Sequence, residues 1–356
     1  MAISAAAASP PGAVRDHGFH PLRVARVVPE TAESASFVLD VPDELRDAYA
    51  YEAGQFLTFR VTVDGQQHLR SYSMSSAPAV DAELQVTVKR VPGGLVSNAM
   101  MDTLGPGDVV ETTRPAGVFC LGPGDGDVVA FAAGSGITPV YSVVKAALAT
   151  TSRRVRLLYA NRDRDSVIFG EALDALAARY PGRLAVENRL DVEQGFVDAA
   201  AVAPFADDIV DADVYVCGPT PFMDIVEGAL LARGVDPARI LIERFGPAPP
   251  PPPVAPEPAA ATGTTVTIEL DGRRGSVEHH PGTTILQTAR EMGMAPPFSC
   301  EAGNCATCMA RVVEGSVSMY TNNALTDEEV ADGWVLTCQS VPTSDTVHVV
   351  YGYGEA

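Results

Sequence analysis

A run of prolines near residue 250 restricts most strongly how this chain can fold. Eight of the twelve residues from Pro247 to Pro258 are proline, and the others are alanine, valine and glutamate. Proline lacks the N–H group that a helix or a central strand needs, so we expect an extended polyproline II segment that rises about 3.1 Å per residue. The 356 residues suffice for several cores. We therefore expect a linker at 247–263 and a separate module at 264–356.

The residues before the linker change pattern once. From about Pro21 to Thr113, short apolar and polar alternations are punctuated by glycine and proline, which predicts an antiparallel β-barrel or sandwich. From Asp127, strand-like runs such as DVVAFAA alternate with helix-like runs such as PVYSVVKAALA, which predicts a doubly wound parallel α/β sheet. We expect domains at 19–124 and 125–246, preceded by a disordered stretch at 1–18.

Composition narrows the range of partners and compartments. The formal net charge of −20 would repel a phosphate backbone, so we expect no nucleic-acid partner; an electropositive protein surface and plain solubility both explain the charge. No apolar run reaches the roughly 18 to 20 residues of a membrane helix. The opening MAISAAAASPPG has no basic region, and we expect no signal peptide. These features predict a cytoplasmic protein with no membrane partner.

Four of the six cysteines lie close together near the C-terminus. Cys300, Cys305 and Cys308 are spaced C-x4-C-x2-C, and Cys338 follows after 29 residues. This is the plant-type spacing for four thiolates around one [2Fe-2S] cluster, and the small residues between them allow backbone N–H groups to approach the sulfurs. Zinc and disulfides are alternatives, but zinc sites usually pair their cysteines, and a Rieske centre needs two histidines that neither loop contains.

The predicted barrel carries RSYSMSS, which begins at Arg70. A flavin needs an aromatic wall, a hydroxyl or N–H near its N5 atom, and a cation with backbone amides for its pyrophosphate. Tyr72, Ser73 and Arg70 supply these groups in that order, and a Gly93-Gly94 turn before Ser97 presents amides to phosphate. Taken alone, the motif is more typical of an ordinary edge strand with a satisfied tyrosine.

Two glycine turns in the predicted α/β sheet suit a nucleotide. After DVVAFAA, the turn Gly134-Ser-Gly-Ile-Thr-Pro139 leads into a helix, with Thr138 expected at the N-cap and Pro139 at the first helical position. Pro139 stands where the dehydrogenase fingerprint has its third glycine. The turn from Cys217 to Met223 follows DVYV and is expected at the same carboxyl edge of the sheet. A buried structural cysteine is the alternative for Cys217.

Together and in this order, the motifs resemble the ferredoxin–NADP reductase superfamily. With its C-terminal ferredoxin module, the chain is similar to the reductase components of multicomponent oxygenases. It looks closest to the 3-ketosteroid 9α-hydroxylase reductase and phenylacetyl-CoA epoxidase reductase group, through RSYSMSS, LLYANRDRDSVIF and LTCQSVP. The resemblance implies a β-barrel flavin domain, a doubly wound nicotinamide domain and an α+β (β-grasp) ferredoxin domain. It also implies that ILIERF ends the reductase module, with Glu243 near the hydride path and Phe245 stacked on the flavin.

The resemblance and the motifs give one set of expected site residues. Ser73, Cys217 and Glu243 are the expected catalytic residues, and the four cysteines are the expected metal ligands. The expected flavin-binding residues are Arg70, Ser71, Tyr72, Ser73, Val88, Lys89, Gly94, Leu95, Val96, Ser97, Thr138 and Phe245. The expected nicotinamide-binding residues are Gly134, Ser135, Gly136, Ile137, Thr138, Pro139, Asn161, Arg162, Cys217, Gly218, Pro219 and Met223.

The cofactors implied are FAD, a [2Fe-2S] cluster and NADH or NADPH. The phthalate dioxygenase reductase branch uses FMN instead, but the GGLVSN turn favours FAD. Asn161 stands where NAD-selective sites often carry a carboxylate, and Arg162 suits either a 2′-phosphate or solvent. We favour NADH because the steroid-type relatives are mainly associated with it.

The function expected from these features is electron transfer from NAD(P)H through FAD and the cluster to a partner oxygenase. Steroid or aromatic ring hydroxylation is the first expectation for that oxygenase; a di-iron phenylacetyl-CoA-type epoxidase or an alkane monooxygenase is the alternative acceptor. The C-terminal module has twelve acidic and four basic residues from Thr264 onward, which fits docking on a basic partner. A redox sensor and a stand-alone flavin reductase are the rival functions, and we expect a monomer.

Overall fold

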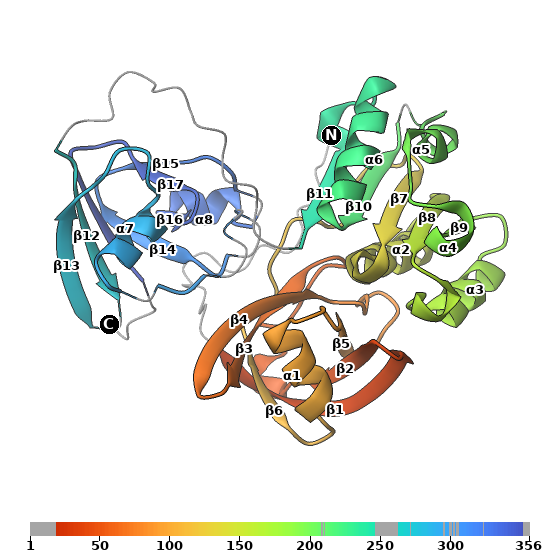
Figure 1. Cartoon of the computed structure of the whole chain (residues 1–356), viewed down its shortest axis with the longest axis horizontal. Helices are drawn as coiled ribbons and strands as arrows, with labels where there is room; N and C mark the ends of the chain where they lie inside the picture. The colour runs from red at the N-terminus through yellow and green to blue at the C-terminus, as the bar shows by residue number, and fades with distance from the viewer. Residues whose placement is uncertain are drawn as a thin grey trace.

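Three main β-sheets follow one another along the chain, each built from one continuous stretch (Figure 1). The computed structural model describes residues 19–207, 209, 211–245, 263–270, 272–294, 296–298, 301, 303, 306–322 and 324–351. The stretches expected to be a disordered N-terminus and a proline linker lie outside these residues, except for Gly263. No helix in the described part of the chain is long and apolar enough to cross a membrane.

The first sheet is antiparallel and has the strand order β4-β3-β6-β1-β2-β5. An isolated bridge between Met74 and Val86 joins its two edges, which confirms the expected barrel. Alternating side chains fill the interior, including Leu22, Phe37 and Phe59, all at most 1% exposed. The elements are β1 (His20–Thr31), β2 (Ser34–Asp40), η1 (Asp43–Leu45), β3 (Phe56–Val63), β4 (Gln66–Ser73), β5 (Leu84–Lys89), α1 (Leu95–Thr103) and β6 (Val109–Thr112).

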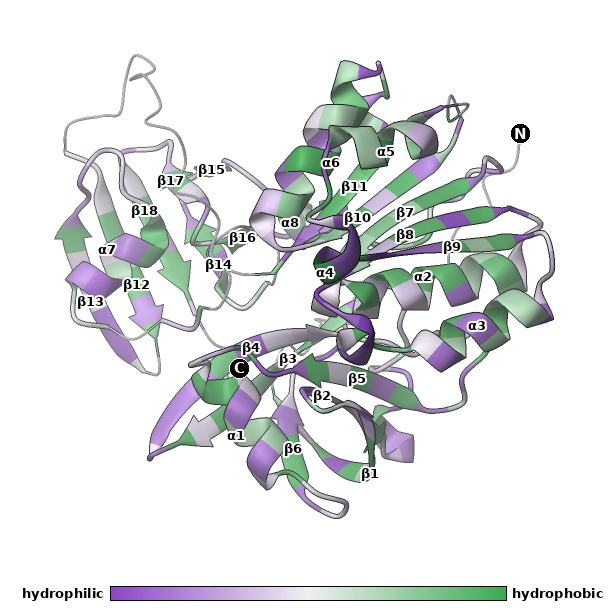
Figure 2. Cartoon of the chain, turned by 45° about the vertical axis from the view of Figure 1, so that its right-hand side comes forward, coloured by the Kyte–Doolittle hydropathy of each residue, from purple (hydrophilic) through white to green (hydrophobic). Residues whose placement is uncertain are grey.

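The second sheet is parallel, with the order β11-β10-β7-β8-β9, and helices cover both faces. The run VVAFAA in β7 is buried at every position because β7 lies in the middle of the sheet, between two helical layers (Figure 2). The elements are β7 (Val128–Ala133), η2 (Gly134–Gly136), α2 (Ile137–Thr150), β8 (Val155–Asn161), η3 (Arg164–Ser166), α3 (Gly170–Arg179), β9 (Leu184–Leu190), α4 (Asp191–Gln194), α5 (Ala199–Ala206), β10 (Asp213–Gly218), α6 (Thr220–Ala232), η4 (Pro237–Arg239) and β11 (Ile240–Arg244).

Helix α2 fastens the second sheet to the barrel. Its Ser142 hydroxyl donates to the carbonyl of Ser76 at 2.6 Å and accepts from the N–H of Gly54 at 3.2 Å. One turn on, the ammonium of Lys145 forms an ion pair with Asp81 and is only 8% exposed. Because leaving a nearly buried ammonium without its partner is costly, these contacts help to fix how the barrel meets the parallel sheet.

The third sheet has the order β13-β12-β18-β14-β16, in which β12 and β18 run parallel. Helix α7 packs on it through Ile285 and Ala289, as expected for a β-grasp fold. A small second sheet pairs β15 with β17. The elements are β12 (Thr265–Leu270), β13 (Arg273–Glu278), α7 (Ile285–Glu291), β14 (Met309–Glu314), β15 (Val317–Met319), α8 (Asp327–Ala331), β16 (Trp334–Leu336), β17 (Ser340–Pro342) and β18 (Thr346–Val350).

Candidate cofactor and electron-transfer site

The glycine turn after β7 differs in detail from its prediction. The backbone from Gly134 to Gly136 forms a 3₁₀ turn that continues directly into α2, so Gly136 is the N-cap and the helix begins at Ile137. The expected N-cap at Thr138 is therefore wrong, and Pro139 is the third helical residue. The hydroxyl of Thr138 donates to the carbonyl of Ser135 at 3.0 Å. Proline is tolerated because N–H groups in a first turn have no intrahelical partner.

The two glycine turns meet where the strand order reverses. β7 and β10 are neighbours, and their connections leave toward opposite halves of the sheet, which is the topological position where open α/β sheets bind ligands. A Cβ on Gly136 would lie 2.1 Å from the carbonyl oxygen of Cys217, so only glycine permits this approach. The expected juxtaposition of the Gly134 and Cys217 turns is confirmed.

Three expected catalytic residues converge at this edge. Cys217 and Glu243 are register partners on β10 and β11, and the hydroxyl of Ser73, at the end of barrel strand β4, donates to the Glu243 carboxylate at 3.0 Å. The Glu243 residue is partly exposed, but its carboxyl group is closely surrounded by protein. Desolvation raises its pKa to about 8, and the Ser73 hydrogen bond acts in the opposite direction. The buried thiol of Cys217 likewise has a raised pKa, through burial and then the nearby Glu243.

The barrel residues expected at the flavin lie along one strand and one helix start. Tyr72 is half-buried against Phe59, and burial raises its pKa to about 12. Arg70 is exposed and donates to the carbonyl of Leu69 at 2.7 Å. Gly94 is the N-cap of α1, so the first amides of that helix lack intrahelical partners, as a phosphate site requires. The hydroxyl of Ser97 accepts from the Val91 N–H at 3.1 Å.

Lys89 lies between the two expected cofactor sites. It ends strand β5 of the barrel, yet its ammonium nitrogen lies 3.4 Å from where a Cβ on Gly134 would stand. Gly134 itself has φ +53°, the left-handed region that glycine enters at no steric cost. A cation from the barrel thus faces the nucleotide turn of the parallel sheet.

The end of strand β8 carries an unsatisfied amide. Asn161 is 4% exposed, and neither amide atom has a hydrogen-bond partner at bonding distance, although the Tyr159 hydroxyl is close by. A buried side chain left in this state loses the hydrogen bonds it would make in water, which fits a position that meets a ligand. The next residue, Arg162, forms ion pairs with Asp163 at 2.8 Å and with Glu33 of the barrel at 3.9 Å.

Two of the four expected metal ligands are in the described part of the chain. Cys308 and Cys338 are 3% and 5% exposed and share an apolar cluster with Leu286 and Trp334. Two sulfur donors in such a shell fit the thiolate ligation of iron. Cys300 and Cys305 lie outside the described residues. Beside them, Glu301 and Ala306 have positive φ values of 50° each, typical of a loop that wraps tightly.

The cluster loop also contacts the barrel. The hydroxyl of Thr307, next to Cys308, lies 3.4 Å from that of Thr58 on β3, which is in turn 2.9 Å from the hydroxyl of Ser71 on β4. In Figures 1 and 2 the third sheet stands beside β3 and β4. The expected metal loop and the RSYSMSS strand are therefore neighbours.

Some expected residues take less direct positions. Val88, Val96 and Met223 are at most 2% exposed and point into hydrophobic cores, so only their backbones are available to a cofactor. Leu95 and Phe245 are exposed. Gly218 ends β10 in close contact with Phe222 and Ala133, Pro219 is the exposed N-cap residue of α6, and Ile137 is buried in the core beneath the turn.

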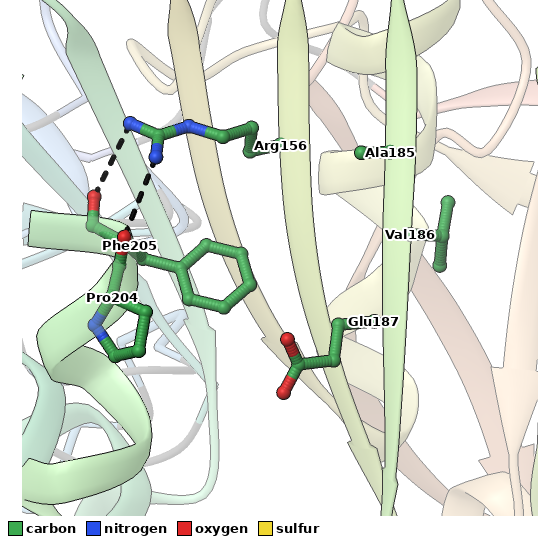
Figure 3. A pocket seen from close by; sticks show the side chains of 6 residues that line it. All are labelled: Arg156, Ala185, Val186, Glu187, Pro204 and Phe205. Carbon is green, nitrogen blue, oxygen red and sulfur yellow. Dashed lines mark hydrogen bonds between the residues drawn. The ribbon is translucent and has the colours of Figure 1, made fainter.

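One surface hollow lies away from this junction. It has a volume of about 450 Å³ and is lined by Arg156, Ala185, Val186, Glu187, Pro204 and Phe205 (Figure 3). Arg156 donates to the carbonyls of Pro204 and Phe205, at the C-terminal end of α5. The four lining residues that come from strands lie toward the amino ends of β8 and β9, whereas ligands of open α/β sheets bind at the carboxyl ends. The hollow is therefore not part of the cofactor site.

The sequence missed several residues that the fold brings to the site. Glu33 and Thr58 belong to no recognised motif, so no local signal identifies them. Thr307 lies inside the C-x4-C-x2-C motif, but nothing in that motif indicates a contact with the barrel. Asp163 could have been identified from the sequence, because it directly follows Arg162. In the structure its side chain caps a short turn by accepting from the N–H of Ser166.

Comparison with known proteins agrees with this geometry. Family models match an oxidoreductase FAD-binding domain at residues 21–120, an oxidoreductase NAD-binding domain at 131–228 and a 2Fe-2S iron-sulfur cluster binding domain at 268–343. The chain is 40% identical to the ferredoxin reductase component of 3-ketosteroid-9-alpha-monooxygenase from Rhodococcus rhodochrous, covering 93% of this chain and 96% of that protein.

Two further known proteins match nearly the whole chain. A 1,2-phenylacetyl-CoA epoxidase subunit from Escherichia coli (strain K12) is 34% identical, covering 92% of this chain and 97% of that protein. The solved structure of phthalate dioxygenase reductase superposes with a TM-score of 0.59 at 24% identity, covering 94% and 98% of the two chains, and it shows a common fold.

Proposed function

Because this chain belongs to the family of oxygenase reductases that combine FAD-binding, NAD-binding and 2Fe-2S domains, we propose that it delivers electrons from NADH to a separate oxygenase that hydroxylates a steroid or an aromatic ring. The bound FAD would accept two electrons from the nicotinamide and release them singly to the [2Fe-2S] cluster. The observation that carries the proposal is the junction of Ser73, Cys217 and Glu243, which joins the barrel to the nucleotide edge.

Different residues of this chain would bind the FAD, the nicotinamide nucleotide and the iron. Tyr72 and the amides that begin α1 would hold the FAD, and Asn161, Lys89 and the Gly134–Gly136 turn would hold the nicotinamide nucleotide. Ser73 and Glu243 would keep a neutral hydrogen-bonded pair at the hydride path near pH 7, because the pKa of Glu243 is raised to about 8. Cys217 would line the gap between the two rings, since its side chain is buried beside Glu243. Cys300, Cys305, Cys308 and Cys338 would ligate the iron.

We favour NADH over NADPH for an electrostatic reason. The guanidinium of Arg162, the cation beside Asn161, is already engaged by Asp163 and by Glu33. A 2′-phosphate arriving here would meet two carboxylates and one guanidinium, a net negative surface, and would also compete for the ion-paired arginine. The uncharged 2′-hydroxyl of NADH brings no such penalty, and the free amide of Asn161 suits it.

The partner is proposed from chemistry and from the relatives. The acidic C-terminal module favours an oxygenase with a basic docking surface. The Rhodococcus relative is a component of a 3-ketosteroid monooxygenase, which supports a steroid substrate; the Escherichia coli relative keeps a phenylacetyl-CoA-type epoxidase as the alternative acceptor. We propose a monomer with domains at 19–124, 125–246 and 264–356. We also propose that it is cytoplasmic, because an iron-sulfur cluster held by thiolates suits a reducing compartment.

Anaerobic titration of the purified chain tests the proposal. An excess of NADH should bleach the visible absorbance of both the flavin and the cluster, and NADPH should do so more slowly. Bleaching of the flavin alone would contradict the proposed electron path. Reconstitution with steroid and aromatic oxygenases then identifies the acceptor.

The same preparation separates the rival functions. A redox sensor would not sustain repeated turnover of cytochrome c with NADH. A stand-alone flavin reductase would keep full activity towards the oxygenase after Cys308→Ser, whereas the proposed reductase should lose it.

A further inference from the structure

An arginine on helix α7 reaches the loop that carries the first three cysteines. Arg290 donates from both terminal nitrogens to the two carboxylate oxygens of Glu301, at 3.0 and 2.9 Å. Glu301 directly follows Cys300 in the sequence. The planar guanidinium also lies over the ring of Phe298, 4.0 Å from its centroid. A two-pronged pair held on an aromatic face has a defined geometry that a lysine would not reproduce.

The backbone at Glu301 is held from a second side. The side-chain amide of Gln339, a residue 6% exposed, donates to the carbonyl of Glu301 at 2.9 Å and to that of Cys338 at 3.1 Å. Glu301 has φ +50°, a left-handed conformation that is strained for a residue other than glycine. Such a conformation persists only where its surroundings enforce it. Arg290 and Gln339 together supply that restraint.

We propose that Arg290 is a positioning residue of the [2Fe-2S] site. Through its contact with Glu301 it holds the backbone next to Cys300 in the left-handed conformation, and Gln339 ties the same residue to the backbone at Cys338. The pair thus slows release of the cluster, and its two opposite charges largely cancel in their effect on the midpoint potential. Side chains that orient metal ligands from outside the coordination shell are known to control metal retention.

An ordinary surface ion pair is the competing explanation. Both side chains are about one-third exposed, at 34% and 35%, and exposed pairs contribute little to stability. The two explanations differ in what each charge does. An ordinary surface pair would affect the cluster through its charges alone. If the pair positions the loop, removing either Arg290 or Glu301 should also make the protein lose its cluster faster.

Two neutralising variants, Arg290→Gln and Glu301→Gln, separate these effects in the full-length holoprotein. Reduction makes the cluster more negative, so losing the cation should lower the midpoint potential and losing the carboxylate should raise it. Both variants should nevertheless lose the visible cluster absorbance about tenfold faster than wild type under excess chelator. The control Arg274→Gln removes an ion pair with Glu269 on β12 and β13 of the same module and should leave both readouts unchanged.

Arg290→Lys keeps the charge and carries the test if the glutamine variants do not accumulate. It should leave the midpoint potential near that of wild type and still accelerate cluster loss, because an ammonium cannot make the two-pronged contact. Wild-type rates of cluster loss in Arg290→Lys and Glu301→Gln would overturn the proposal. Equal acceleration in Arg274→Gln would overturn it as well, because the effect would then be a general loss of stability.

Discussion

At the scale of single residues, Glu243 shows how the fold sets a chemical state that its residue type does not predict. A carboxyl group of this kind ordinarily has a pKa of 4.5, but desolvation at the end of β11 raises it to about 8. Near pH 7 the folded protein therefore holds a neutral acid beside the hydroxyl of Ser73. The sequence placed Glu243 near the hydride path by resemblance, yet its protonation depends on packing that no local pattern encodes.

This raised pKa predicts a pH dependence. As pH rises through about 8, Glu243 ionises, and a negative charge appears at the proposed hydride path. We expect the rate of flavin reduction by NADH to fall by roughly tenfold between pH 7 and pH 9.5, less than the ~10²–10⁴-fold typical of groups that transfer a proton, because Glu243 would act through its charge. Glu243→Gln stays neutral and should give a flat profile, measured by anaerobic stopped-flow absorbance.

The free energy of unfolding should also depend on the ionisation of Glu243, and it should decrease as pH rises. The folded state favours the protonated acid, so its penalty for ionisation begins above the ordinary pKa of 4.5, grows with pH and is complete above about 8. Glu243→Gln should remove this dependence, which chemical denaturation at several pH values would reveal. A declining rate profile that survives in Glu243→Gln would assign the titration to another group.

Nucleotide choice gives the third prediction at this scale. Glu33→Gln removes one of the two carboxylates that engage Arg162. Since both side chains are more than one-third exposed, we expect the ratio of kcat/KM for NADPH to that for NADH to rise only about two- to fivefold. Glu44→Gln, an exposed position on the same barrel, should leave the ratio unchanged.

A larger change is expected when both carboxylates are neutralised. Asparagine at position 163 can still cap the following turn, so Glu33→Gln with Asp163→Asn should raise the ratio further without loss of folding. An unchanged ratio in the double variant would mean that Arg162 does not face the 2′ position. The sequence could not reveal Glu33, because it reaches Arg162 only through the docking of barrel on sheet.

At the scale of elements, the sequence predicted buried strands well and helix starts less well. The uninterrupted apolar run of β7 predicted a strand of the parallel sheet, and the structure places this strand in the middle, where both faces are covered. The start of α2 was misplaced because the 3₁₀ turn at Gly134–Gly136 already has helical direction, so no separate cap is needed at Thr138. The polar run Gln66–Ser73 forms β4, which its mixed alternation only partly indicates.

The close approach of the two glycine turns predicts a steric cost. Gly136 has φ −61°, which alanine adopts freely, so the only obstacle is a Cβ placed 2.1 Å from the carbonyl oxygen of Cys217. Gly136→Ala should destabilise the protein by about 1–3 kcal/mol, the usual range for overpacking, and weaken NADH binding as the turns separate. Equilibrium denaturation and fluorescence titration measure the two effects.

Another glycine in a helix of the same sheet provides the control. A Cβ on Gly228 in α6 would meet nothing within 4 Å. Gly228→Ala should therefore stabilise the protein by up to about 1 kcal/mol through helix propensity and leave NADH binding unchanged. Tight NADH binding by a stable Gly136→Ala protein would show that the turns can separate without harm to the site.

At the scale of the whole molecule, the ferredoxin module must meet the barrel to receive electrons. The sequence predicted both modules and the linker between them, but it contained nothing about how they dock. Docking depends on surface side chains from separate modules, here Thr58 and Thr307, whose hydroxyls lie 3.4 Å apart. Each is an ordinary threonine in its own segment. The two hydroxyls come together only when both modules are folded and docked.

This contact predicts a selective kinetic effect. Thr58→Val keeps the shape of the side chain but removes the hydroxyl that touches both Thr307 and Ser71. Loss of a hydrogen bond worth about 1 kcal/mol should reduce the docked population and slow electron arrival at the cluster by up to about fivefold. Reduction of the flavin by NADH, an earlier step at another edge of the barrel, should keep its wild-type rate.

Two further variants test whether the kinetic effect is specific to docking. Thr62→Val alters an exposed threonine on the same strand and should leave both phases unchanged. Ser71→Ala removes the neighbour on β4 but leaves the Thr58–Thr307 contact in place, so it should slow cluster reduction less than Thr58→Val does. Stopped-flow absorbance, with the flavin and cluster bands followed separately, distinguishes the phases. Cluster reduction as fast in Thr58→Val as in Thr62→Val would mean that electrons cross in a different arrangement of the modules.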